Sequence, residues 1–284
     1  MSARFAHLHL HSEYSLTDST IRLPELVKAC ASRGLPAVAV TDQSNLFALV
    51  KFYKAAQGAG IKPIAGSDVL VEMDDGTQTQ LTLLCRDRSG YLNLSQLLTR
   101  AWLEGHQGDH VRVQAQWVRE HADGLFLLAG RRSDIAHHLR EHKFAQAQAA
   151  LQRWQSAFAD RCYLELSRTG HEDETLFNQA AQWLAGSQGC AAMISNDVRF
   201  LDRDGFDAHE ARVCIAGGRQ LGDPRRPRDY REEQYLRSGE EMASLFSDLP
   251  EALDNTLDLA ARCNLELRLG TYYLPAFPVP DEHT

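Results

Sequence analysis

Short apolar runs alternate with helix-like segments up to about residue 203 of this 284-residue chain, and this alternation constrains the fold more than any other feature. Strand–helix alternation is typical of parallel strands joined by crossover helices. The runs predict an α/β fold, an open or closed seven-stranded (β/α) barrel, with its chemistry at the carboxyl ends of the strands. The expected strands are Ala6–His11, Ala37–Thr41, part of Pro63–Val71, Leu81–Arg86, Leu125–Ala129, Cys162–Leu166 and Ala191–Ser195.

Helices are expected between these strands. One follows Pro24 and stops at Gly34, because proline suits a first turn and glycine ends a helix. A second is expected to begin near Ser44, a good N-cap, and to end before Gly58. The remaining helices are expected at about 89–104, 115–121, 132–158 in two pieces, 172–186 and 250–263, the last one capped by Asp248.

Alternating histidines stand at the head of the chain, where residues 5–12 read Phe-Ala-His-Leu-His-Leu-His-Ser. A strand has a side-chain period of two, so His7, His9 and His11 are expected on one face and the intervening apolar residues on the other. Imidazole is the commonest metal ligand in proteins, so the pattern indicates a zinc-type or mixed divalent site.

Polar residues also follow the other predicted strands. They are Asp18, Asp42, Gln43, Asp68, Gln80, Arg168, Asp197 and Arg199. His9 and His11 with one strand-end aspartate could hold a divalent ion and lower the pKa of a bound water toward about 7. The same pattern fits metal-dependent amidohydrolases. Asp42 is expected to cap the helix near Ser44 rather than to act as an acid or base.

The composition narrows the class of protein. The formal net charge is −8, and an acidic domain is a poor general binder of polyanions because phosphate contacts need Lys and Arg. No apolar run approaches the roughly 18 residues that span a membrane, and no signal peptide is visible, so a soluble, cytoplasmic protein without a membrane partner is expected. The six cysteines form no CxxC pair and are expected as buried free thiols.

The pattern changes after about residue 203. Residues 217–237 read GGRQLGDPRRPRDYREEQYLR, which we interpret as a solvated loop with local ion pairs, with a phosphate or partner contact as the alternative. The tail LPAFPVPDEHT has three prolines and is expected to be a linker. We therefore expect one domain over residues 1–270, with an appendage from about 203, and a linker over 271–284 toward a missing domain.

Five segments occur in an order that resembles the polymerase-and-histidinol-phosphatase (PHP) domain at the N-terminus of the alpha subunit of bacterial DNA polymerase III, proteobacterial type. They are HLHLHSEYSLTDS, AVTDQSNLFALVKFYKAAQGAGIKPIAGSDV, LTLLCRDRSGYLNL, YLELSRTG and SNDVRFLDRDGFDAHEARVCI. The resemblance covers essentially the whole chain, including the LPAFP that leads into the polymerase core in that family. It implies a distorted seven-stranded (β/α) TIM-like barrel of the PHP type with a C-terminal helical and loop appendage.

The resemblance also implies a metal cluster, whose ligands we carry over position by position. The two histidines of the first motif match His9 and His11, and its acidic residue matches Asp18. The glutamate after the third strand is the shorter Asp68, and the aspartate of the closing Asp-x-His is Asp197. His7 lies outside this set and is expected to be structural.

Four ligand positions of the family are lost. Gln43 and Gln80 each replace a histidine, Arg199 replaces the closing histidine, and the ligand after the sixth strand falls at Arg168 or Thr169. An arginine offers no lone pair and puts a fixed positive charge where a cation should sit. We therefore expect that no multi-metal cluster forms, and that the orphaned aspartates pair with Arg199 or Arg168 instead.

The resemblance with these losses implies a domain of DNA replication with a degenerate metal site. The expected role is a non-catalytic structural module and docking platform for the proofreading 3′–5′ exonuclease subunit. No cofactor is expected in this domain, with one weakly bound Zn²⁺ or Mn²⁺ as the alternative. Mg²⁺ and most DNA contacts are expected in the missing polymerase core. The competing functions are a residual metal-dependent phosphoesterase, as proofreading nuclease or pyrophosphatase, and an amidohydrolase-like hydrolase.

Overall fold

A curled sheet forms the centre of the molecule in the computed structural model, which describes residues 5–108, 110–272 and 274. Its strands pair in the order β4-β5-β2-β3-β6-β7-β8, and β1 pairs with β2. The described strands are β1 (Ala37–Val40), β2 (Lys62–Glu72), β3 (Gln78–Cys85), β4 (His106–Gln107), β5 (His110–Gln114), β6 (Leu125–Ala129), β7 (Cys162–Ser167) and β8 (Ala191–Ser195).

The N-terminal segment closes this sheet toward a barrel. His7 forms a parallel bridge with Val38 in β1, and Leu10 forms one with Val198 just after β8. The predicted strand Ala6–His11 is therefore an extended segment with isolated bridges rather than a regular strand. This segment is the seventh element of the barrel, beside β1, β2, β3, β6, β7 and β8. The predicted barrel-like α/β fold is thus confirmed, in a distorted form.

Two of the described strands, β3 and the short β4, run against their neighbours, which corrects the expectation of parallel strands throughout. β3 is antiparallel to both β2 and β6, and a tight turn at 73–77 with Gly76 at a φ of 82° joins it to β2. The turn replaces a crossover helix because two strands five residues apart can only pair antiparallel. As a result the first residues of β3 lie at the same rim as the last residues of its neighbours, and Thr82 lies opposite Asp68.

The barrel interior has an apolar floor. Every second residue of the barrel strands points inward, as strand periodicity requires. These inward residues form one apolar cluster, which is separate from the larger core under the helices. The inward residues include Ala39, Leu84, Phe126 and Met193. The last helix, α10, packs Leu259, Ala260 and Cys263 into the same cluster and so covers the bottom of the barrel.

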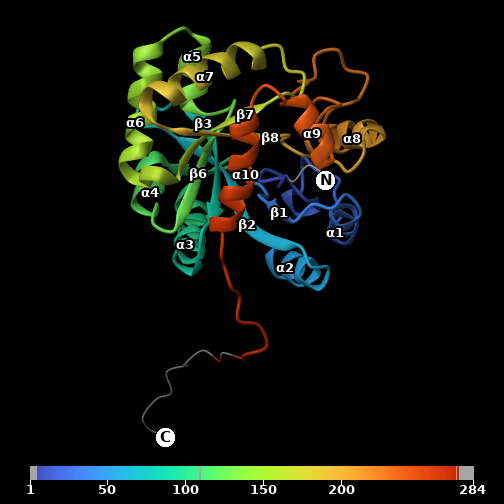
Figure 1. Cartoon of the computed structure of the whole chain (residues 1–284). Coiled ribbons are helices and arrows are strands. Elements are labelled where there is room, and N and C mark those ends of the chain that lie inside the picture. The colour runs from blue at the N-terminus through green and yellow to red at the C-terminus, as the bar shows by residue number, and fades with distance from the viewer. Residues whose placement is uncertain (1–4, 109, 273, 275–284) are drawn as a thin grey trace, which may run out of the picture.

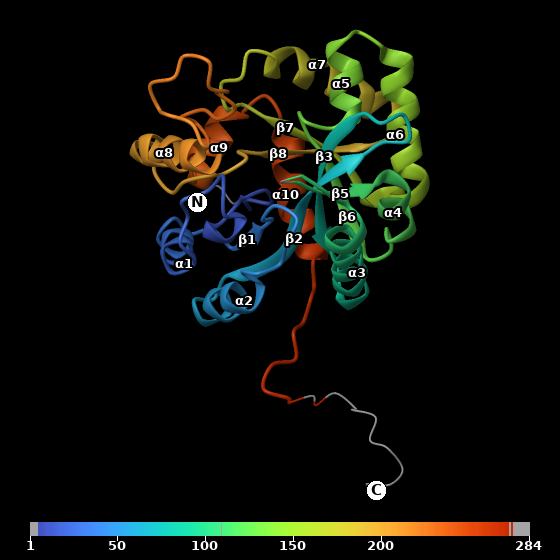
Figure 2. The ribbon, with the colours of Figure 1, turned by 180° about the vertical axis from the view of Figure 1, so that it is seen from behind.

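The helices lie around the sheet in two groups. Seen from the front and from behind, α3 to α6 lie on one side, and α1, α2, α8 and α9 lie on the other (Figures 1 and 2). Their bounds are α1 (Leu23–Ser32), α2 (Leu49–Gly58), α3 (Arg88–Glu104), α4 (Ala115–Glu120), α5 (Asp134–Arg140), α6 (Phe144–Phe158), α7 (Glu174–Gln188), α8 (Phe206–Ala216), α9 (Gly239–Leu245) and α10 (Pro250–Arg262).

Three predicted helix caps, at two helices, are wrong. The helix expected from Ser44 begins at Leu49, because the Ser44 backbone takes a positive φ of 52° and its N–H bonds the Asp68 carbonyl. Asp42 therefore caps nothing and accepts hydrogen bonds from Ser12 instead. Asp248 caps no helix either, because its carboxylate pairs with Arg168.

A bend at His9 breaks the expected alternation of the N-terminal segment. Ala6 and Leu8 belong to the barrel floor, whereas Leu10 belongs to the outer core, so the chain changes face between Leu8 and Leu10. His7 does not join the later histidines, and its Nε2 bonds the Arg237 carbonyl at 2.8 Å. The three histidines therefore do not share one face.

The remaining expectations concern cysteines, membranes and the tail. All six cysteines are free and buried, as predicted. Among the described residues, the helices are all too short or too polar to cross a membrane. The expected linker over 271–284 lies largely outside the described residues, which reach Tyr272 and Leu274. The described part of the chain after α10 contains no helix or strand.

Candidate functional site

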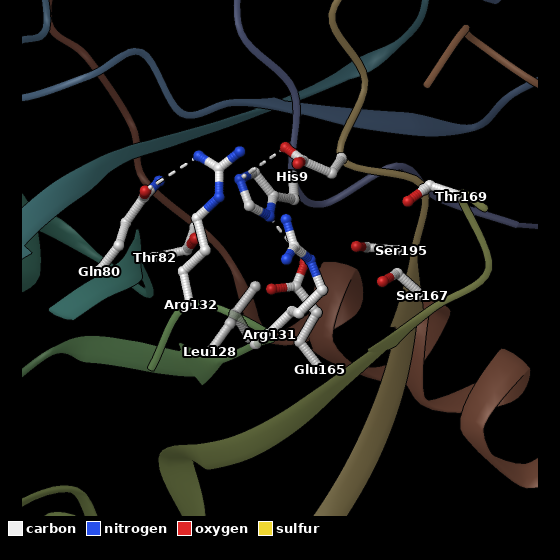
Figure 3. Close-up of a pocket in the computed structure, with 12 residues that line it drawn as sticks. His9, Gln80, Thr82, Leu128, Arg131, Arg132, Glu165, Ser167, Thr169 and Ser195 are labelled. Atoms are coloured by element: carbon white, nitrogen blue, oxygen red, sulfur yellow. Dashed lines mark hydrogen bonds and ion pairs between the residues drawn. The ribbon is translucent and has the colours of Figure 1, made fainter. Parts of the chain in front are cut away.

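Polar side chains fill the barrel interior above its apolar floor. They come from the carboxyl ends of β2, β7 and β8, from the first residues of β3, and from the N-terminal segment. Figure 3 shows His9, Thr82 and Glu165 around one cavity, above Leu128 of the floor. The reversed direction of β3 is what brings Thr82 to this rim. The site therefore occupies the position that barrel architecture assigns to chemistry.

Asp68 lies at the centre of the site, where several polar side chains contact it, and is fully buried. Its Oδ2 lies 2.9 Å from His9 Nε2 and 3.0 Å from His11 Nε2. Gln80 Nε2 donates to the same oxygen at 2.5 Å, and the Thr82 hydroxyl donates to Oδ1 at 2.5 Å. A buried carboxylate is stable only when its oxygens are satisfied in this way.

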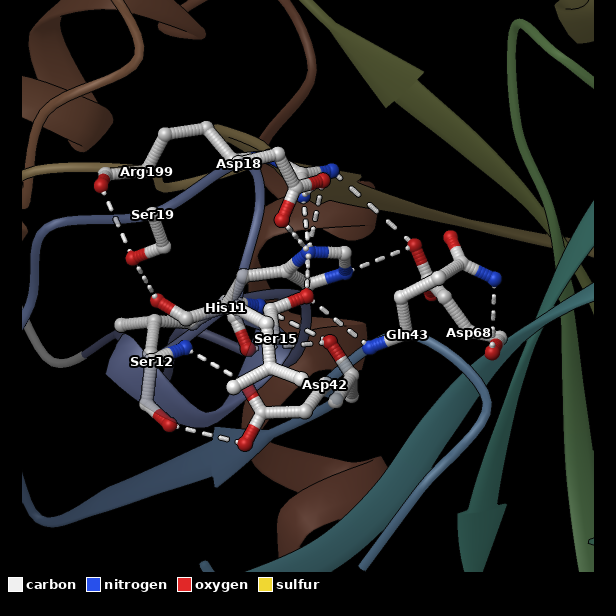
Figure 4. Close-up of polar contacts among 12 residues, drawn as sticks. His11, Ser12, Ser15, Asp18, Ser19, Asp42, Gln43, Asp68 and Arg199 are labelled. Carbon is white, nitrogen blue, oxygen red and sulfur yellow. Dashed lines mark hydrogen bonds and ion pairs between the residues drawn. The ribbon is translucent and has the colours of Figure 1, made fainter. Parts of the chain in front are cut away.

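Arg199 lies within the ring of aspartates and is also fully buried. Its Nη1 lies 2.7 Å from Asp18 Oδ2 (Figure 4). Its Nη2 pairs with Asp197 Oδ1. Its Nη2 is also 3.9 Å from Asp68 Oδ2. The structure thus brings together Arg199 and the aspartates that the sequence analysis expects it to pair with.

The two site histidines are held as donors. Burial acts to lower the pKa of His9, but the carboxylates of Asp68 and Glu165 outweigh it and raise that pKa well above the usual range. The pKa of His11 is also raised, because Asp18 and Asp68 outweigh burial and Arg199. The charge of Arg199 offsets part of the negative charge of Asp18, Asp68, Asp197 and Glu165.

The pKa values of the site aspartates are shifted in the opposite direction, downward. Burial acts to raise the pKa of Asp18, but His11 and Arg199 hold it far below the usual range. The pKa of Asp197 is likewise held low against burial by Arg199 and His9. These carboxylates therefore stay ionised in the folded chain, with cations from the protein itself as partners.

One set of donor atoms among the described residues could hold a metal ion. His9, His11 and Asp68 present ligand atoms within 4.8 Å of one another. Each imidazole is held at Nδ1 by a carboxylate, His9 by Glu165 at 2.7 Å and His11 by Asp18 at 2.9 Å, which is how ligating histidines are usually oriented. The other aspartates face the Arg199 guanidinium, whose charge would repel a further cation.

Gln43 and Gln80, which the sequence analysis expects at lost ligand positions, act as hydrogen-bond donors. Gln80 donates to the Asp68 carboxylate, and Gln43 Nε2 donates to the Asp68 backbone carbonyl at 3.2 Å. Gln43 and Asp68 also form a parallel bridge between the end of β1 and β2. Both amides thus hold Asp68 in place at this rim.

Arg168 does not lie in the site, which corrects its expected pairing with the remnant aspartates. Its guanidinium turns outward, where it forms two hydrogen bonds of 2.8 and 2.7 Å to Asp248 and packs over the Phe246 ring. Thr169, the other candidate at this position, lines the cavity, and its hydroxyl donates to Glu174 at 2.6 Å. Arg199 is therefore the one arginine among these ligand positions that enters the described site.

Sequence reasoning missed several residues of the site. Glu165 holds His9, and an acidic residue inside the apolar strand CYLELS is a signal that could have revealed it. Tyr230 reaches Asp18 with its hydroxyl at 3.3 Å, from the arginine-rich segment interpreted as a solvated loop. His209 in α8 is buried, and its Nε2 bonds the Asp18 carbonyl at 2.9 Å. For these last two, no local pattern was available.

The aspartate network should weaken in acid. An unfolded aspartate titrates near pH 4, whereas the pKa of Asp18 is lower in the folded chain, so the unfolded chain takes up its proton first. The stability that this carboxylate contributes is complete above about pH 4 and is lost as the pH falls below that value. In urea titrations, the stability gap between the original chain and Asp18→Asn should shrink by roughly 1 kcal/mol per pH unit below pH 4. Asp160→Asn, at an exposed aspartate, serves as the control. A constant gap for Asp18→Asn between pH 6 and 3 would contradict the expectation.

Comparisons with known proteins agree with this architecture. The family model of the PHP domain matches residues 7–169. This chain therefore belongs to the PHP domain family.

Its curated relatives are much longer proteins. The chain is 53% identical over 298 residues to the DNA polymerase III subunit alpha of Xylella fastidiosa, with 100% of this chain and 25% of that protein covered. It is 45% identical over 284 residues to the protein of the same name from Escherichia coli, with 99% and 24% covered. The chain thus spans about a quarter of the length of these relatives.

A solved structure resembles the fold. An amidohydrolase from Chromobacterium violaceum superimposes with a TM-score of 0.50 at 16% identity, over 73% of this chain and 96% of that one. At this identity the likeness concerns the fold alone.

Proposed function

We propose that this chain is the N-terminal PHP domain of the alpha subunit of a replicative DNA polymerase III, acting in DNA replication in the cytoplasm. Full-chain similarity to proteins of that name supports the assignment. The parent protein would be a DNA-directed DNA polymerase, whose Mg²⁺ site and main DNA contacts lie outside this chain. The domain itself serves as a structural module without catalysis.

One observation carries the non-catalytic role: the buried guanidinium of Arg199 between Asp18 and Asp197. A metal cluster activates water by placing several cations among carboxylates and imidazoles. Here the guanidinium of Arg199 supplies the positive charge at that place. Unlike a metal ion, it cannot act as a Lewis acid toward water, and it cannot leave the protein. The carboxylates then link the N-terminal segment to the loop after β8, which stabilises the barrel where its strand ladder is weakest.

Metal analysis and activity assays on the purified chain test this role. We expect metal content well below one ion per chain and no hydrolysis of phosphodiesters or pyrophosphate in Mn²⁺ or Zn²⁺. His11→Ala should then change stability but leave the background rates unchanged. Stoichiometric metal with turnover that His11→Ala abolishes would overturn the proposal.

The second candidate is a phosphoesterase with one weakly bound Zn²⁺ or Mn²⁺. It is favoured by the paired Nε2 atoms of His9 and His11 facing Asp68, each ring held at Nδ1 by a carboxylate. An ion at these donors would polarise a phosphoryl oxygen and a water molecule. The assays above distinguish the two candidates directly.

Docking of the proofreading 3′–5′ exonuclease subunit is the partner role that we propose for the module. It rests on the intact barrel combined with the altered ligand positions, since a barrel that no longer needs metal can persist as a scaffold. A pull-down with the purified exonuclease subunit tests it, and absence of binding to this chain would count against it.

A further inference from the structure

Two consecutive arginines, Arg131 and Arg132, stand between β6 and α5 at the mouth of the barrel. Both line the cavity that reaches His9, and Figure 3 shows the Arg131 guanidinium on the side of Ser167 and Ser195 and the Arg132 guanidinium on the side of Gln80. Both are partly buried. Arg132 is linked to the Asp68 network through the side chain of Gln80.

The arginine pair is short of carboxylate partners. Among the described residues, no carboxylate lies within 4.0 Å of Arg132, whose Nη1 donates only to the amide oxygen of Gln80 at 3.2 Å. Arg131 reaches Asp173 at 3.6 Å, but Arg140 holds that carboxylate more closely, at 3.0 Å. Burial and the neighbouring Arg132 lower the pKa of Arg131. Two partly desolvated like charges with so little compensation favour an anionic ligand.

The acids in the same cavity do not supply that compensation. Glu165 is engaged by His9 at 2.7 Å, and Asp197 pairs with Arg199. By contrast, Ser195 is 1% exposed, and its Oγ has no hydrogen-bond partner. A buried hydroxyl left unpaired at the wall of a cavity indicates a missing polar ligand, since such groups are nearly always satisfied.

The space fits a tetrahedral anion at the mouth. The inner cavity measures about 30 Å³, and about 10–15 Å³ is enough for one water-sized atom. A second cavity of about 360 Å³ shares Arg131 and Arg132 with it and is also lined by Arg140, Tyr230 and two carboxylates, Asp173 and Asp229. One or two oxygens of a ligand can thus enter toward Ser195 while the rest lies between the arginines.

We propose that Arg131 and Arg132 form a metal-independent site for a phosphoryl oxyanion, with Ser195 donating to it from the cavity wall. Guanidinium groups recognise such oxygens through paired, charge-assisted hydrogen bonds. The anion comes either from free phosphate or from the terminal phosphate of a nucleic acid strand. The site needs neither metal nor hydrolysis, so it stands whichever function of the metal remnant is correct.

Titration calorimetry of the 284-residue chain with inorganic phosphate at constant ionic strength, in the presence of a metal chelator, tests the site. We expect saturable binding of one phosphate, weakened at least about tenfold in Arg131→Gln and in Arg132→Gln. Ser195→Ala should weaken it by a smaller factor. Arg225→Gln is the matched control, because that side chain is 86% exposed and bonds within its own turn. Thermal unfolding of each variant checks that the fold persists.

Oligothymidylate with and without a 5′ phosphate distinguishes the sources. If the phosphorylated strand displaces inorganic phosphate and the unphosphorylated strand does not, the terminal phosphate is a ligand. If neither strand displaces it, free phosphate is the ligand. Equal binding of phosphate to the original chain and to Arg131→Gln/Arg132→Gln, or binding that requires added metal, would overturn the proposal.

Discussion

Arg199→Ala will lower the free energy of unfolding by roughly 3–5 kcal/mol, the usual cost of removing one partner of a buried ion pair. The truncation leaves the buried Asp18 and the partly buried Asp197 ionised and without their main cation. For a domain of this size that loss lowers the melting temperature by on the order of 10 °C. Chemical denaturation followed by circular dichroism measures both quantities.

The control for this prediction is an exposed arginine with an ion pair of similar length. Arg100→Ala removes a pair with Glu104 on the surface of α3, where the expected loss is about 0–1 kcal/mol. Arg199→Lys keeps the charge but cannot reach both aspartates with a fork, so its stability should lie between the alanine variant and the original chain. A loss for Arg199→Ala no larger than for Arg100→Ala would show that the aspartates are not held by the guanidinium.

Restoring three histidines, as Gln43→His/Gln80→His/Arg199→His, will raise the affinity for Zn²⁺ or Mn²⁺ by about 100-fold or more. Each substitution replaces a donor group or a fixed cation by a lone pair at the rim around Asp68. A lost outer partner alone changes metal affinity 10–100-fold, so restored ligands should do no less. Competition against a chromogenic chelator measures the affinity.

The matched control is Arg168→His, added to the triple variant. Because Arg168 points away from the site to Asp248, this fourth histidine should leave the metal affinity unchanged. Equal affinity of the triple variant and the original chain would mean that the ligand positions were assigned wrongly. A further gain from Arg168→His would mean that the side chain turns inward when a metal binds.

Apolar periodicity was enough to predict most of the barrel, because β6, β7 and β8 are buried runs that differ little from their predicted bounds. The direction of β3 could not be predicted in that way, since a strand has the same pattern in both directions. The bend at His9 could not be predicted either, because alternation in the sequence does not reveal where a segment bends.

The candidate site shows even more clearly what the sequence alone cannot predict. Arg168 and Arg199 both follow strands, and the sequence analysis offers both as replacements of metal ligands, yet only Arg199 enters the barrel. The difference is made by Asp248, eighty residues away from Arg168, which offers that side chain a partner outside. The choice between two partners depends on the folded arrangement of distant segments, which one sequence read locally does not contain.

The floor of the barrel determines how this domain can be joined to anything that follows it. Leu259, Ala260 and Cys263 enclose the apolar interior, and the chain then leaves past Tyr53, whose hydroxyl accepts a hydrogen bond from the Leu267 N–H. A tension applied to the departing segment therefore acts first on the closure of the barrel itself. Movements of a neighbouring module at that end would reach the strands directly, whereas a cut before α10 would leave the barrel interior open to water.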